Sequence, residues 1–157
     1  MAAGFVKRIT AGLMLALILT GHITKPDQLP GNVDLWELQC LSGSMDCENG
    51  SNGDECLLLT GSVALNRRNS SRWKGSTVEE VIMAYESGWQ YAKPTRDAFR
   101  TRKAPEHTVL LAKYLLLYGP ICPENVVYQG TGYNGSGLYR ELKNLPGQKV
   151  SEKFCFE

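Results

Sequence analysis

The pattern of apolar residues changes along the chain, from helical patterns before Cys122 to strand-like stretches after it. Residues 56–65 are apolar almost all round, which is typical of a fully buried helix. Residues 106–118 carry apolar side chains at helical spacing and end at Gly119-Pro120. After Cys122 the pattern changes to short β-branched and aromatic stretches between Gly, Asn and Pro turns, which predicts strands. These predicted strands cover residues 126–128, 137–139 and 150–156.

Three shorter helices are predicted before the strands. Residues 34–40 resemble an opening helix of one or two turns, and a polar loop is expected from 42 to 55. Ser76 and Glu79 match a capping box, which predicts a helix from there to about residue 85. Residues 95–102 form a short polar helix candidate. The pattern therefore predicts an α+β fold, a helical body followed by a small C-terminal strand lobe.

The N-terminus has the pattern of an export segment. Lys7 and Arg8 precede a short apolar run over residues 9–19, as in a signal peptide or a membrane anchor of marginal length. Both alternatives place the protein outside the cytoplasm, either secreted or membrane-anchored through residues 9–23. We therefore expect a signal peptide or anchor helix at 1–24, a linker at 25–33 and one catalytic domain at 34–157.

Composition narrows the classes of function. The chain has 157 residues, 43% of them apolar, and a net charge of +1, so it can bury one ordinary core and has no field that attracts nucleic acid. Its five cysteines would allow two disulfides in an oxidising compartment, with the pairing open. None of them forms a C-x-x-C motif, which argues against a zinc site. No metal and no cofactor are expected.

Four carboxylates gather just before the apolar helix, at Asp46, Glu48, Asp54 and Glu55. A calcium-binding EF-hand loop requires Gly at its sixth position and Glu at its twelfth. The sixth residue here is Ser51 and the twelfth is leucine, so that type of site is excluded. On composition alone the segment is a solvated polar loop.

A set of short motifs favours a functional interpretation of this loop over a solvated one. Glu48 is followed, across the apolar helix, by Leu65-Asn66-Arg67, and later by Gln90-Tyr91-Ala92 after a helix. Apolar-aromatic strands at 126–128 and 154–156 close the series. In this order and spacing, the motifs resemble the SleB/CwlJ-type cell wall hydrolases, the family of spore cortex-lytic enzymes. The resemblance covers residues 34–157 and implies a compact lysozyme-like helical body with a small C-terminal antiparallel β lobe.

The resemblance implies cleavage of peptidoglycan glycan strands. Glycosidic cleavage needs a carboxyl that protonates the leaving oxygen. As in a lytic transglycosylase, Glu48 would act first as acid and then as base. Asp46, Asp54 and Glu55 are second-carboxylate candidates if the reaction is a hydrolysis. A catalytically inactive peptidoglycan-binding or lysis-assembly protein is the alternative.

Further residues are expected around the substrate. Where the family has a hydroxyl residue and a final-strand histidine, this chain has Ala92 and Lys153. Asn66 would orient Glu48 or a sugar, or else cap its helix. Arg67 is expected to pair with a carboxylate. The substrate-binding candidates are Asn66, Gln90, Tyr91, Tyr128 and Tyr133.

Overall fold

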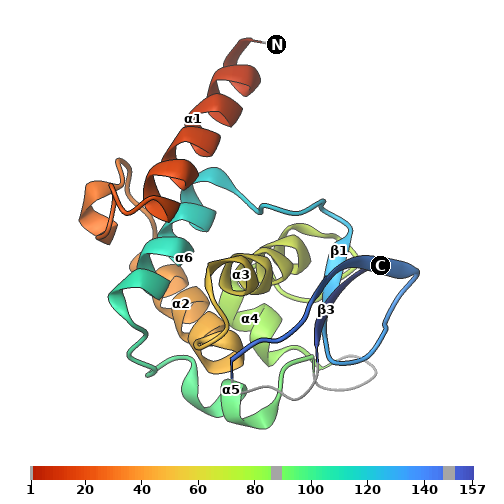
Figure 1. Ribbon diagram of the computed structural model, residues 1–157. Coiled ribbons are helices and arrows are strands. Elements are labelled where there is room, and N and C mark those ends of the chain that lie inside the picture. Colours follow the sequence, from red (N-terminus) through yellow and green to blue (C-terminus); the bar gives the residue numbers. More distant parts are fainter. Residues whose placement is uncertain (1, 86–89, 147–150) are drawn as a thin grey trace.

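The fold is a helical body with a three-stranded antiparallel sheet on one side (Figure 1). The computed structural model describes residues 2–85, 90–146 and 151–157. Mixed helix and antiparallel sheet confirm the predicted α+β class. The elements within the described residues are α1 (Ala2–Leu19), the 3-10 helix η1 (Pro26–Gln28), α2 (Leu35–Asn49), α3 (Asp54–Asn69), α4 (Val78–Met83), α5 (Lys93–Ala98), α6 (Glu106–Tyr118), β1 (Val126–Gly130), β2 (Gly137–Leu142) and β3 (Glu152–Phe156).

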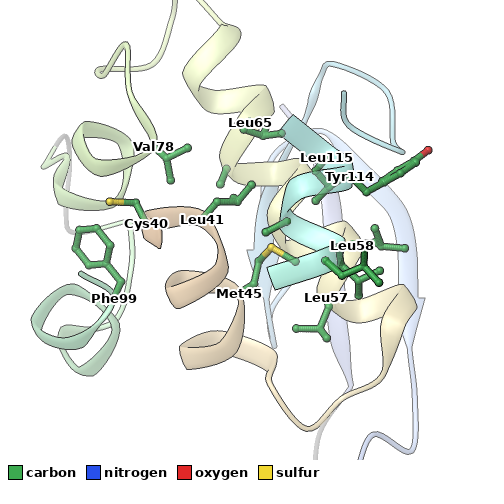
Figure 2. Packing of buried hydrophobic residues seen from close by; sticks show 14 of the residues in the cluster. Cys40, Leu41, Met45, Leu57, Leu58, Leu65, Val78, Phe99, Tyr114 and Leu115 are labelled. Atoms are coloured by element: carbon green, nitrogen blue, oxygen red, sulfur yellow. The ribbon is translucent and has the colours of Figure 1, made fainter. Parts of the chain in front are cut away.

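The main core lies between α2, α3 and α6, with α4 and α5 closing one side. Leu41 and Met45 of α2, Leu65 of α3 and Leu115 of α6 are buried there (Figure 2). Gly61 of α3 admits the side chains of Met45 and Leu115, which a Cβ atom would displace. As predicted for an all-round apolar segment, α3 is buried from residue 56 to residue 67.

A second, smaller core joins α3 to the sheet. Cys56, Leu59 and Val63 on one face of α3 pack against Val126 of β1 and Phe154 of β3. The strand order is β1-β3-β2, so β3 is central and pairs antiparallel with both neighbours. Because β3 is covered by α3 and flanked on both edges, residues 152–155 are all buried.

Helix α2 is longer than predicted, and this changes the setting of Glu48. The sequence predicts a polar loop from Ser42, but α2 continues to Asn49. The Ser42-Gly43-Ser44 segment is buried rather than solvated, because Gly43 without a side chain lets the backbone of Phe99 approach α2. The polar-loop prediction is therefore wrong for residues 42–49, and Glu48 projects from the last turn of a helix.

The cap of α4 lies one residue later than predicted. Thr77 is the N-cap and accepts a hydrogen bond from the backbone N–H of Glu80, while Ser76 N–H donates to the Glu80 carboxylate. Ser76 and Glu79 therefore do not form the predicted capping box. Glu79 instead accepts from Trp36 and Arg100, which links α4 to α2 and α5.

The N-terminal segments contact the helical body along α6. The part of α1 nearest the body packs through Ile18, and Tyr114 O–H donates to the carbonyl of Ala11, while the rest of the helix projects away (Figure 1). Lys113 Nζ donates to the carbonyls of Pro26 and Leu29, and Leu29 is buried. Across residues 2–85, 90–146 and 151–157, no helix has both the length and the hydropathy needed to cross a bilayer. The predicted boundaries at residues 24 and 33 stay predictions.

All five cysteines are free thiols, so neither of the two disulfides that their number allows is formed. Four of the five are buried. Burial raises the pKa of Cys56 to about 12 and that of Cys122 to about 11, so these thiols stay protonated near neutral pH. Such thiols act as small apolar groups in the two cores.

Replacement of Gly43 by alanine tests the contact that positions α5 on α2. A Cβ atom there would overlap the Phe99 carbonyl oxygen, a backbone atom that no rotamer change can move. We expect Gly43→Ala to lower the free energy of unfolding by about 3 kcal/mol, measured by urea denaturation. Gly12→Ala on α1 is the matched control, since nothing lies within 4 Å of its added methyl group. Gly12→Ala should keep the stability of the wild type or raise it slightly. Equal free energies of unfolding for Gly43→Ala and Gly12→Ala would contradict the packing described.

Candidate active site

Glu48 is held by a neutral hydroxyl. It lies half-buried in the last turn of α2, and Thr95 Oγ1 donates to its Oε1 at 2.5 Å. Thr95 is buried in the first turn of α5, where Pro94 favours the start of the helix. The α2–α5 contact at Gly43 therefore brings the hydroxyl to the carboxylate.

The other three carboxylates of the segment are engaged by nitrogen atoms of basic side chains. Asp46 pairs with Arg102, Glu55 lies 2.7 Å from Arg140 Nη2, and Asp54 lies 2.8 Å from the ring nitrogen Nε2 of His107. Glu48 forms no ion pair with any cation that the structure describes. Two of the three predicted second carboxylates are thus paired with arginines and the third with the His107 ring, whereas Glu48 accepts from the Thr95 hydroxyl.

The backbone beside Glu48 is fixed by a chain of buried amides. Asn49 Nδ2 donates to Thr60 Oγ1 of α3, and Asn52 Nδ2 donates to Asn49 Oδ1, both at 2.7 Å. These bonds hold the turn between α2 and α3, which is one wall of an open pocket of about 400 Å³. The pocket is lined by Glu48, residues 49–52, Asp46, Cys47 and Arg102. A polar ligand can therefore reach the carboxylate of Glu48 from solvent.

An aromatic and cationic wall is joined to α5, the helix that carries Thr95, because Arg96 Nε donates to the carbonyl of Tyr91 at 3.1 Å. The guanidinium carbon of Arg67 is 4.6 Å from the ring centre of Trp73 and 5.4 Å from that of Tyr91. Tyr128 contacts Trp73 edge-on, with the ring centres 5.5 Å apart. Burial raises the pKa of the Tyr91 hydroxyl, and the positive charge of Arg67 lowers it. Hereafter Arg67, Trp73, Tyr91 and Tyr128 are called the aromatic wall.

The contacts of Arg67 differ from the expected carboxylate pairing. Its Nε donates to the carbonyl of Val127 at 2.7 Å, and its guanidinium lies against Trp73 and Tyr91. No described carboxylate forms an ion pair with it. Trp73, which the sequence interpretation did not select, is therefore part of the wall. The signal that could have identified it is an isolated tryptophan within a polar turn.

The remaining predicted substrate residues lie in different settings. Asn66 is buried, and its Nδ2 donates to the carbonyls of Pro123 and Val126, so the amide joins α3 to β1. It does not cap α3, which continues to Asn69. Gln90 is half-buried next to Tyr91. Tyr133 is 70% exposed, with Lys153 Nζ 5.1 Å from its ring centre.

A fifth carboxylate near Glu48 was missed in the sequence. Glu152 on the central strand β3 is only 7% exposed. Its pKa is raised, first by burial and then by the negative charge of Glu48, while Lys153 lowers it. The sequence does show a charged residue within a predicted strand. Alternation of apolar and polar residues could not show that this strand is central and buried on both faces. The negative charge of Glu48 on α2 therefore acts on a buried carboxyl group of β3.

The stability of the protein should report the charge state of Glu152. Because its folded pKa lies above the ordinary 4.5, the folded protein keeps a proton that the unfolded chain has lost. The contribution of the Glu152 carboxyl to the free energy of unfolding is fully present below pH 4.5, and it is lost as the pH rises through the pKa of the folded state. Glu152→Gln should remove this part of the pH dependence, measured by urea unfolding from about pH 4 to about pH 8. A variant that becomes less stable than wild type as the pH rises would contradict the assignment.

Comparison with known proteins gives this chain no relative. No protein-family model, no curated protein and no solved structure matches it. The functional assignment therefore depends on the geometry of its own residues.

Proposed function

We propose that this protein cleaves the glycan strands of bacterial peptidoglycan, with Glu48 as its acid and base. The observation that carries the proposal is the contrast among the carboxylates of residues 46–55. Asp46 and Glu55 are paired with arginines and Asp54 with the His107 ring, whereas Glu48 is held by the Thr95 hydroxyl at the edge of an open pocket. A carboxyl that must give and then take a proton works best without a fixed cation beside it.

The reaction we propose needs one such carboxyl. Glu48 gives its proton to the glycosidic oxygen that leaves, and the bond from that oxygen to the muramic acid ring breaks. The resulting carboxylate takes the proton from the muramic acid's own hydroxyl, whose oxygen closes onto the ring carbon. The product is an anhydro end, and the carboxyl is again protonated. The protein thus acts as a lytic transglycosylase.

The state of Glu152 favours this route over hydrolysis. The common hydrolytic route uses an ionised second carboxylate beside the sugar. Burial and the charge of Glu48 raise the pKa of Glu152 and so favour its neutral form. Asp46 and Glu55 are held by arginines, and Asp54 by the His107 ring. A single working carboxylate is therefore the arrangement that these contacts support.

Fold and export pattern are consistent with this function. A helical body with a small antiparallel sheet is what the resemblance to the SleB/CwlJ-type hydrolases and a lysozyme-like domain implies. Peptidoglycan lies outside the cytoplasm, and we propose that Lys7, Arg8 and the apolar residues 9–19 direct export or anchoring. The alternative, an inactive glycan-binding protein, would use the same aromatic wall but would not need an unpaired Glu48.

Digestion of purified peptidoglycan by the full chain, followed by mass spectrometry, tests the proposal. We expect anhydro-muropeptides from the wild type and a loss of about 10²–10⁴-fold for Glu48→Gln, since acid–base catalysis typically contributes that much. Glu55→Gln is the matched control, because its carboxylate is half-exposed and paired with Arg140. Reducing ends would instead establish a hydrolase, and retained glycan binding without products would establish the inactive binder.

Thr95 should act as a positioning residue. Thr95→Val keeps the shape of the side chain but removes the hydroxyl that Glu48 accepts from. We expect a loss of about tenfold in kcat, because one hydrogen bond to a charged group is broken. Thr95→Ser should restore most of the rate. Equal rates for the Val and Ser variants would show that the hydroxyl has no part in the reaction.

A further inference from the structure

Four buried polar atoms lie on or next to the aromatic wall without a hydrogen-bond partner. They are Arg67 Nη1, Trp73 Nε1, Tyr91 Oη and Gln129 Oε1. Buried polar groups in folded proteins are nearly always paired, so each exception requires an explanation. Arg67 lies against both Trp73 and Tyr91, and Gln129 follows Tyr128 along β1. Three of the four unpaired atoms therefore belong to one cluster of side chains around Arg67.

Three of these four atoms are donors and point to an acceptor, whereas Gln129 Oε1 is itself an acceptor. The indole N–H, the phenol O–H and the guanidinium N–H are all donors, and the guanidinium carries a positive charge. Arg67 and Tyr91 are more than nine-tenths buried, at 3% and 4% exposure. Donors around a buried guanidinium match an oxygen-rich acyl group, a carboxylate or an amide carbonyl, better than a lone sugar hydroxyl.

The donors are also held in place. Arg67 Nε is bonded to the Val127 carbonyl, and the neighbouring Asn66 ties the same turn of α3 to the start of β1. Trp73 is confined between the guanidinium and the edge of Tyr128. Polar atoms kept rigid and unpaired destabilise the free protein but favour a ligand that pairs them. This arrangement is typical of a preformed binding site.

We propose that Arg67, Trp73 and Tyr91 form a subsite for the lactyl acyl group of a muramic acid residue. This inference rests on the proposed function and names what the aromatic wall recognises. The lactyl group distinguishes muramic acid from N-acetylglucosamine, and its acyl oxygens belong either to a free carboxylate or to the amide of a peptide stem. Arg96 Nε donates to the carbonyl of Tyr91, and the adjacent Thr95 donates to Glu48, so the subsite is joined to the helix that holds the catalytic carboxyl and would take the muramic acid whose bond is cleaved.

Binding by the full chain tests this subsite with three probes. The experiment uses calorimetry in a Glu48→Gln background. The first probe is a tetrasaccharide that contains muramic acid and whose lactyl carboxylates are free, and the second is the same glycan with those carboxylates amidated by L-alanine. The third probe is chitotetraose, which lacks lactyl groups. We expect Tyr91→Phe and Trp73→Phe each to weaken binding of a lactyl-bearing glycan about tenfold, and to leave chitotetraose binding unchanged. Tyr91→Phe should unfold at the same or a higher temperature, since it removes an unpaired buried hydroxyl and keeps the ring. Trp73→Phe also removes ring contacts with Arg67 and Tyr128, so it should lose some stability.

Tyr114→Phe is the matched control. Its hydroxyl is also on a buried tyrosine but donates to Ala11, so this variant should lose stability and keep its glycan preference. A loss confined to the free-acid glycan would identify the carboxylate as the ligand, and equal losses for both glycans would identify the acyl oxygen common to them. An unchanged ratio of lactyl-bearing glycan to chitotetraose in both Phe variants would overturn the subsite. A parent chain that binds none of the three probes would overturn the proposed function itself.

Discussion

Burial of α3 on all sides is the constraint on which the rest of the structure depends. One face of this helix supports α2 and α6 in the main core, and the other supports β1 and β3 in the smaller one. Near its C-terminal end, Asn66 and Arg67 donate to the carbonyls of Pro123, Val126 and Val127. These hydrogen bonds thus join the helical body to the sheet. Because the junction is buried, a polar group that lost its partner there would have no water to bind instead.

The candidate site is a consequence of this junction. Glu48 comes from the end of α2, Thr95 from α5, Arg67 from α3 and Glu152 from the central strand. No two of these residues are close in sequence, and each is positioned by an element that packs on α3 or on α2. The candidate site therefore requires both cores to be in place, although Glu48 and Thr95 belong to neither core.

Much of the fold follows from spacing alone. The buried helix at residues 56–65 was predictable because it is apolar almost all round, and the helix at 106–118 because its apolar residues recur at helical spacing. The strands after Cys122 were predictable from short β-branched and aromatic stretches between turn residues. The end of α2 was not, since Ser42-Gly43-Ser44 has the composition of a loop and becomes helical only because Phe99 approaches Gly43. That contact joins residues far apart in the chain, so no local pattern records it.

The site was predictable to a lesser extent. Motif order selected Glu48, Tyr91 and Tyr128, and the structure brings Tyr91 and Tyr128 onto one wall through Arg67 and Trp73. Trp73 and Glu152 were missed because their surroundings are set by tertiary packing.

Strand order has a consequence for how the protein is made. β3 follows β1 and β2 along the chain yet lies between them, and the two outer strands pair with β3 only. Synthesis of the first two strands leaves two separate edges with nothing to join them. The central strand is therefore the last of the three to be synthesised, and β1 and β2 acquire their common partner only when residues 152–156 lie between them. Glu152 belongs to that strand, so the burial of its carboxyl group depends on the same pairing.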